Sequence, residues 1–154
     1  MSTDAKIRKP SAKAKTLSAR LMAVQALYQS VHNKQGLKSV TDEFLSTRVE
    51  MEIDGETIVK PDGVLFKKIL ESVQERGDDL AVLIDSNIKR ENKDLGILLR
   101  SLLTCAAAEL LANPESDPPV IINDYLNVAE SFFDSGEKGL INGILDAIAK
   151  AVRP

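Results

Sequence analysis

Two residues of this 154-residue chain are of types that can act together as a nucleophile and its base, and each occurs once. They are Cys105 and His32, and a histidine beside a cysteine can generate a reactive thiolate. Cys105 lies within the most apolar stretch of the sequence, which favours a small core residue, and His32 stands at the end of a helical pattern. No third group is placed to orient such a pair, so we do not expect the chain to be an enzyme.

The sequence also lacks the patterns that hold metals or phosphates. A single cysteine excludes an internal disulfide and a cysteine-based zinc site, and the acidic residues do not repeat at ligand spacing. None of the eight glycines directly precedes a Lys-Ser or Lys-Thr pair, as a phosphate-cradling loop requires. We therefore expect no metal and no cofactor.

Basic residues gather at the amino-terminal end, where they could contact the phosphates of a nucleic acid. The first twenty residues hold six basic residues and one acid, net +5, whereas the remainder holds 14 basic and 22 acidic residues, net −8. Such an arm suits a polyanion, although a solvated tail that aids solubility fits the composition equally well. Lys13, Lys15 and Arg20 lead into the first helix, where Gln25 could contact unpaired bases.

The elements that must position these residues are all helices. Residues 1–14 show no apolar periodicity and are expected to form a disordered basic arm, and residues 15–154 a single helical domain. From Leu17 onwards apolar residues recur at spacings of three and four, which is typical of amphipathic helices. Tyr28 lies on the apolar stripe of the first helix and is expected in the core. No strand pattern appears.

About seven helices are predicted in all. They run from Leu17 to the turn at 33–36, from Ser39 to about 49, from Pro61 to Gly77, over 80–88, over 94–112, over about 120–133, and from beyond Ser135-Gly136 to about 152. Residues 94–112 are apolar nearly all round, which predicts the central, most buried helix. The same stretch is too short and too charged to span a membrane, and the amino terminus lacks a secretory signal. We therefore expect a cytoplasmic protein without membrane contact.

Four sequence blocks occur in an order that carries a family likeness. They are Ala19-Arg20-Leu21-Met22-Ala23-Val24-Gln25-Ala26-Leu27-Tyr28-Gln29, Glu109-Leu110-Leu111, Val120-Ile121-Ile122-Asn123-Asp124, and Leu140-Ile141-Asn142-Gly143-Ile144-Leu145-Asp146. Together they resemble the NusB family of bacterial transcription antitermination factors over roughly residues 15–150. The resemblance implies an all-α, NusB-like helical bundle of two small helical subdomains.

The resemblance also implies a function. NusB proteins bind the boxA segment of nascent ribosomal RNA leaders together with NusE, a small-subunit ribosomal protein. The complex lets transcription of ribosomal RNA pass premature stops, which implies RNA, NusE and the transcription elongation complex as partners. Some NusB proteins dimerise, so a homodimer is a further expectation. The family has no catalytic residue and no cofactor.

Carried over residue by residue, the resemblance puts four residues in or near an RNA-facing region. These are Arg20, Gln25, Lys138 and Asn142, of which the last two form a polar cluster near the start of the last helix. For NusE we expect acidic positions on the fourth and fifth helices, because ribosomal proteins are usually basic. Glu91 and Asp94 are the candidates.

The chain departs from the family where positive charge and an aromatic ring are usual. Lys15-Thr16-Leu17-Ser18 stands in place of an arginine cluster, and Leu140 in place of a phenylalanine. Thr104 replaces a frequent arginine, for which Arg100 one turn earlier could substitute. These changes predict weaker intrinsic RNA affinity or more reliance on the partner, with a flatter salt dependence.

Two alternatives to the antitermination reading stay open. The first is a NusB-fold protein-interaction module with weak or lost RNA binding, which the missing arginines favour. The second is kinship with the NusB-like domain that precedes some ribosomal RNA cytosine methyltransferases. Methyl transfer itself would need a cofactor-binding glycine motif, which this sequence does not hold.

Overall fold

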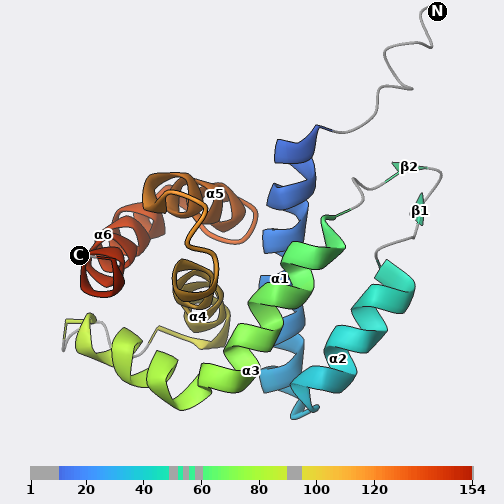
Figure 1. Cartoon of the computed structure of the whole chain (residues 1–154), viewed down its shortest axis with the longest axis horizontal. Helices are drawn as coiled ribbons and strands as arrows, with labels where there is room; N and C mark the ends of the chain where they lie inside the picture. Colours follow the sequence, from blue (N-terminus) through green and yellow to red (C-terminus); the bar gives the residue numbers. More distant parts are fainter. Residues whose placement is uncertain (1–10, 49–51, 54–55, 58–60, 90–94, 154) are drawn as a thin grey trace, which may run out of the picture.

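A computed structural model describes residues 11–48, 52–53, 56–57, 61–89 and 95–153 of the chain. The elements are α1 (Ala12–Asn33), α2 (Leu37–Glu43), the π-helical turn η2 (Phe44–Arg48), β1 (Glu52–Ile53), β2 (Glu56–Thr57), α3 (Gly63–Ser86), α4 (Ile97–Ala112), α5 (Pro118–Glu130) and α6 (Ser135–Val152). Figure 1 shows α4 at the centre, with α5 and α6 on one side, α1, α2 and the first half of α3 on the other, and the second half of α3 below α4. The predicted all-α class is confirmed.

Helix α4 is the centre of the molecule because apolar side chains cover nearly its whole surface. It packs against α1, α3, α5 and α6, and Leu102 and Leu103 are completely buried. Ala106, Ala107 and Ala108 are completely buried as well, and their small side chains allow the neighbouring helices to approach closely. The prediction that this helix would be the central, most buried one is confirmed.

Helix α1 begins earlier than the apolar pattern indicates. Ser11 is its N-cap, and the Ser11 side chain accepts a hydrogen bond of 3.1 Å from the backbone N–H of Ala14. Residues 12–14 of the predicted arm are therefore helical. Residues 1–10 of the predicted arm lie outside the described residues.

Helix α3 joins two of the predicted helices. Asp62 caps its start by accepting a hydrogen bond of 3.0 Å from the backbone N–H of Leu65. The break predicted at Gly77 is a kink one residue earlier, where Arg76 has φ −116° and ψ 19° and the helix continues beyond it. The described part of the chain therefore holds six α-helices where about seven were predicted.

Two further differences concern the segment after α2 and the helix starts. Within the predicted acidic loop, β1 and β2 pair as a short antiparallel hairpin, although no strand was expected. Each strand contributes two residues to this pairing, too few for a visible alternation of apolar and polar side chains. Helices α2, α5 and α6 each begin about two residues before their predicted starts, and α4 begins at Ile97, after Gly96.

The core is one continuous, mostly aliphatic cluster to which all six α-helices contribute. Phe44, Phe66 and Tyr125 are its fully buried aromatic residues. The two groups of helices on either side of α4 therefore share a core. None of the described helices is long and apolar enough to cross a membrane.

Candidate nucleic-acid interface

The first turn of α1 carries two exposed lysines. Lys13 and Lys15 project from a turn that holds no acidic residue. Thr16 donates its hydroxyl hydrogen to the carbonyl of Lys13 at 2.9 Å, and the carbonyl of Lys15 accepts the backbone N–H of Asp62 at 3.0 Å. The second contact attaches the start of α3 to this turn. The turn is thus a fixed part of the fold that presents positive charge to solvent.

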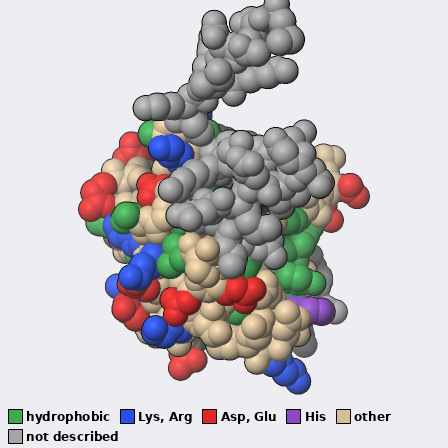
Figure 2. All heavy atoms as spheres, turned by 90° about the vertical axis from the view of Figure 1, so that its right-hand side faces the viewer, with side chains coloured by type: hydrophobic (Ala, Val, Ile, Leu, Met, Phe, Trp, Pro, Cys, Tyr) green, Lys and Arg blue, Asp and Glu red, His purple; other side chains and the backbone are tan. Residues whose placement is uncertain are grey.

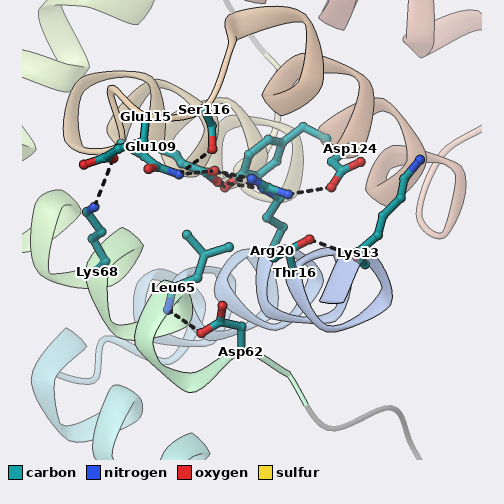
Figure 3. A network of polar contacts seen from close by, with 12 residues as sticks. Lys13, Thr16, Arg20, Asp62, Leu65, Lys68, Glu109, Glu115, Ser116 and Asp124 are labelled. Carbon is teal, nitrogen blue, oxygen red and sulfur yellow. Dashed lines mark hydrogen bonds and ion pairs between the residues drawn. The ribbon is translucent and has the colours of Figure 1, made fainter. Parts of the chain in front are cut away.

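One turn further along α1, Arg20 points inward and meets two carboxylates (Figure 3). Its Nε donates to both oxygens of Glu109 on α4, at 2.9 and 3.1 Å, and its Nη2 donates to Oε2 of Glu109 at 2.5 Å. Its Nη1 donates to Oδ2 of Asp124 on α5 at 2.5 Å. Only 4% of the Arg20 side chain is exposed, so the guanidinium is engaged inside the protein and is not offered to an RNA.

The contacts around Arg20 keep the guanidinium and the neighbouring phenol of Tyr125 in defined charge states. Burial acts to lower the pKa of Arg20, but the hydrogen bonds and charge of Glu109 outweigh it, so the pKa is raised and the guanidinium stays positive. Tyr125 donates its hydroxyl hydrogen to Oε1 of Glu109 at 2.9 Å. Burial, together with the negative charge of Glu109, raises the pKa of Tyr125 well above its ordinary value. The phenol is therefore neutral and acts as a donor.

A second set of contacts links this buried group to the surface loop after α4. The Asn113 side-chain amide donates to Oε2 of Glu109 at 3.4 Å and to the Ser116 hydroxyl at 3.1 Å. From the end of α6, Arg153 donates to the backbone carbonyls of Leu110, at 2.9 Å, of Asn113, at 2.6 Å, and of Ser116. The loop between α4 and α5 is therefore held from both sides.

A hollow of about 390 Å³ opens where α1, this loop and α5 meet. Its lining residues are Ala12, Lys13, Thr16, Arg20, Ser116, Val120 and Asp124. The exposed lysine lies at the solvent side of a depression whose floor is the buried ion pair of Arg20 and Asp124. The hollow therefore combines a cation, an engaged carboxylate, hydroxyl groups and an apolar wall.

The other basic and polar residues predicted to face RNA lie elsewhere. Gln25 is half-buried in the middle of α1. Arg100 pairs with Asp85 at 2.9 Å, and Lys138 pairs with Glu130 at 2.5 Å. Asn142 is exposed on α6 and lines a separate groove between α5 and α6. The structure thus brings Lys13 and Arg20 to one hollow and leaves the remaining candidates apart from it.

The remaining sequence-based expectations concern the partner surface and the two chemically reactive residues. Glu91 and Asp94 lie outside the described residues. Cys105 is completely buried, and burial raises its pKa, so it is held as a neutral thiol. His32 is exposed and stacks on Tyr28, with ring centroids 5.3 Å apart. Tyr28 is half-buried, so the expectation of a core position is only partly met.

Several residues of this region were not singled out from the sequence. Ser116, Val120 and Arg153 gave no local signal. Glu109 and Asp124 gave a weak one, because each is a lone acid within an apolar helical stretch. A buried acid requires a positive partner, and that rule could have directed attention to Arg20.

Comparisons with known proteins agree on one family. Residues 17–150 match the sequence model of the NusB family. The transcription antitermination protein NusB of Sinorhizobium fredii is 36% identical over 138 residues, which cover 88% of this chain and 86% of the relative. The protein of the same name from Rhizobium rhizogenes is equally similar, with the same coverage.

Solved structures show the same fold at lower identity. NusB of T. maritima superposes with a TM-score of 0.72 at 20% identity, covering 96% of both chains. A crystal structure of the antitermination factors NusB and NusE in complex with dsRNA gives a TM-score of 0.67 at 21% identity, covering 88% of this chain and 96% of that chain. From the sequence match over most of its length, this chain belongs to the NusB family.

Proposed function

We propose that this protein is a transcription antitermination factor that binds the boxA RNA of ribosomal RNA leader transcripts together with NusE. The RNA phosphates would lie along the first turn of α1. The observation that carries this proposal is the pair of exposed lysines, Lys13 and Lys15, in a turn without an acidic residue. Bound to NusE and RNA, the protein would join the transcription elongation complex in the cytoplasm.

The position of these two lysines does not favour the stability of α1. The amino-terminal end of a helix carries a partial positive charge, and acidic side chains are favoured there. Lys13 and Lys15 oppose that preference, at a cost of a few tenths of a kcal/mol each when exposed. Phosphates bound at this turn would each interact favourably with the lysine on their side of α1 and with the helix end. The two lysines therefore lower the stability of the helix, and a bound anionic ligand would compensate for that loss.

The comparisons support the same assignment. The curated relatives are named for transcription antitermination, and one solved NusB protein of this fold is in complex with NusE and dsRNA. For the NusE contact, Glu91 and Asp94 stay our candidates, because two acids suit a basic partner. Changing both to lysine should weaken NusE binding in a titration monitored by calorimetry. Unchanged affinity would remove them from the interface.

A second candidate function is favoured by the positions of the other basic residues. Arg20 is buried between two carboxylates, and Arg100 and Lys138 are each paired with an acid. Figure 2 shows basic and acidic side chains interspersed over the described part of one face. A NusB-fold module that binds its protein partner but binds RNA weakly would have these features.

Fluorescence anisotropy of a short boxA RNA distinguishes the two functions. The RNA is titrated with the protein alone and with its cognate NusE, at two salt concentrations. We expect tighter binding with NusE. The double variant Lys13→Ala/Lys15→Ala should lose affinity and flatten the salt dependence by about 0.7 in log–log slope for each lysine that contacts a phosphate.

The matched control is Lys38→Ala/Lys150→Ala, which removes the same charge from two exposed lysines on α2 and α6. If both double variants weaken binding equally, the effect is one of net charge and the first turn of α1 is not the interface. No RNA binding under any condition, with NusE binding intact, would establish the interaction module. Light scattering on the same samples tests for a homodimer.

A further inference from the structure

We propose that the hollow between α1, the loop after α4 and α5 holds one unpaired base of the bound RNA, and that it selects adenine or cytosine over hypoxanthine or uracil. The proposal rests on the proposed RNA-binding function and adds a recognition site to it. It follows from the charge balance, the hydrogen-bonding groups and the walls of the hollow.

The charge balance of the hollow suits a neutral ligand better than a phosphate. Lys13 and Arg20 contribute two positive charges, and Asp124 contributes one negative charge. Glu109, hydrogen-bonded to the same guanidinium, contributes a second negative charge. The four charges cancel, and a phosphate entering the hollow would meet the carboxylate of Asp124. Phosphates therefore belong at Lys13, at the edge of the hollow, and at Lys15 on the same turn of α1, and a base belongs inside.

The carboxylate of Asp124 supplies a hydrogen-bond acceptor inside the hollow. The residue is 3% exposed, and the ion pair with Arg20 uses its Oδ2. Among the described residues, no group donates a hydrogen bond to its Oδ1. An ionised carboxylate only accepts hydrogen bonds, so a ligand must bring a donor to that oxygen. The amino groups of cytosine and adenine are such donors.

A hydroxyl group supplies the complementary donor. The Ser116 oxygen accepts a hydrogen bond from Asn113, and none of the described residues accepts the hydroxyl hydrogen of Ser116, so that hydrogen is available to a ligand. Cytosine and adenine each present a ring nitrogen acceptor next to the amino group. Uracil and hypoxanthine present a carbonyl oxygen where the amino group would be, and that oxygen would face the Asp124 carboxylate. The acceptor and donor in the hollow therefore discriminate between these two kinds of base.

The wall of the hollow gives the base a surface to pack against. Val120 is 54% exposed on the first turn of α5, and Ala12 is exposed at the start of α1. The loop carrying Ser116 is fixed by Arg153 and Asn113. The groups that would recognise a base are thus already in place before any ligand arrives, which lowers the entropic cost of binding.

Single-atom changes in the RNA test the proposal. In the complex with cognate NusE, each adenosine of the boxA RNA is replaced in turn by inosine and each cytidine by uridine, which exchanges the amino group for a carbonyl oxygen. We expect one position at which the exchange weakens binding about tenfold. The variant Asp124→Asn can accept from Arg20 with its amide oxygen and present its NH₂ to the hollow. At that same position it should reverse the preference.

A second variant keeps the test decisive if Asp124→Asn does not fold, as checked by circular dichroism. Val120→Phe would fill the hollow from an exposed position, so it should bind the parent and exchanged RNAs equally. Its matched control is Val82→Phe, at a valine on α3 that is 67% exposed, and it should keep the discrimination. If no position discriminates, or if Val120→Phe keeps the wild-type preference, the base site is wrong while RNA binding stands. If the wild-type complex with NusE does not bind the RNA at all, both the proposed function and the base site are overturned.

Discussion

At the scale of single residues, the guanidinium of Arg20 is the contact that joins three helices. It lies on α1 and pairs with Glu109 of α4 and Asp124 of α5, with all three side chains at most 4% exposed. Removing one member of a buried ion pair leaves an uncompensated charge in a low-dielectric environment, which costs more than the pair itself contributes. Arg20 therefore acts on RNA binding through the fold, by fixing the amino-terminal half of α1 against α5.

The substitution Arg20→Ala tests this role. It leaves two buried carboxylates without their cation and should lower the free energy of unfolding by about 3–5 kcal/mol, measured by urea denaturation. The control Arg100→Ala breaks an exposed pair with Asp85 and should cost less than about 1 kcal/mol. If both variants lower the free energy of unfolding by the same small amount, Arg20 has no structural role and is again a candidate for contact with RNA.

The buried Cys105 and Tyr125 make stability depend on alkaline pH. Burial raises the pKa of both side chains, so the folded protein keeps their protons where the unfolded chain, with ordinary values of 9.0 and 10.0, releases them. The folded state then binds more protons, and the unfolding free energy should fall as pH rises above about 9, by up to about 1.4 kcal/mol per pH unit for each group. Urea unfolding at pH 8 and pH 10 measures the decrease. Cys105→Ala should reduce the decrease, and an unchanged decrease in that variant would contradict the explanation.

At the scale of elements, α3 contacts α1, α2, α4 and α6, and the kink at Arg76 separates two sets of its buried residues. Leu65 to Val73 belong to the first set, and Leu80 and Ile84 to the second. A glycine follows the kink, and another precedes α4. These two glycines have different backbone conformations, so the same substitution should have opposite effects on them.

Gly77→Ala should stabilise the protein, and Gly96→Ala should destabilise it. A Cβ at Gly77 meets no atom within 4 Å, so alanine improves helix propensity and restricts the unfolded chain, a gain of about 0.5–1 kcal/mol. Gly96 has φ +77° and ψ 160°, a region almost exclusive to glycine, so alanine there should cost about 1–3 kcal/mol. The melting temperatures of both variants, measured by thermal unfolding, test the two expectations. A lower melting temperature for Gly77→Ala would mean that the kink itself needs glycine.

At the scale of the whole molecule, the carboxyl-terminal end of α6 is attached to the segment between α4 and α5. Arg153 donates to three backbone carbonyls of the segment that ends α4 and leads into α5. It thereby connects the end of α6 to the loop that lines the hollow beside α1. The end of α6 is thus attached by polar contacts to the end of α4 and to the loop before α5.

Arg153→Ala should weaken the attachment of α6 to the segment between α4 and α5. It removes the guanidinium that donates to three carbonyls, of which that of Asn113 keeps the backbone N–H of Ser116, and it should lower the unfolding free energy by about 1–3 kcal/mol. The control Lys150→Ala, on an exposed position one turn earlier, should stay within about 0.5 kcal/mol. Hydrogen exchange of residues 113–117 should quicken in the Arg153 variant alone. Unaltered exchange there would mean that the loop is held by Asn113 without help from α6.

The sequence alone determined the helical class, the central position of α4 and the site of the bend in α3. These features depend on apolar spacing and on breakers such as Gly77, which act over a few residues and can be read locally. The helix starts were less accurate, because a cap such as Ser11 forms by a single hydrogen bond that periodicity does not report.

Only the tertiary structure decided which basic residues are free to meet a ligand. Arg20 lies five residues after Lys15 in the same basic segment, yet its partners are 89 and 104 positions away in the chain. No local pattern indicates which distant carboxylates a guanidinium will contact. The sequence alone therefore does not distinguish an arginine in a buried ion pair from an arginine that contacts RNA. The hollow has the same origin, because its walls come from α1, α5 and the loop between α4 and α5, which only folding brings together.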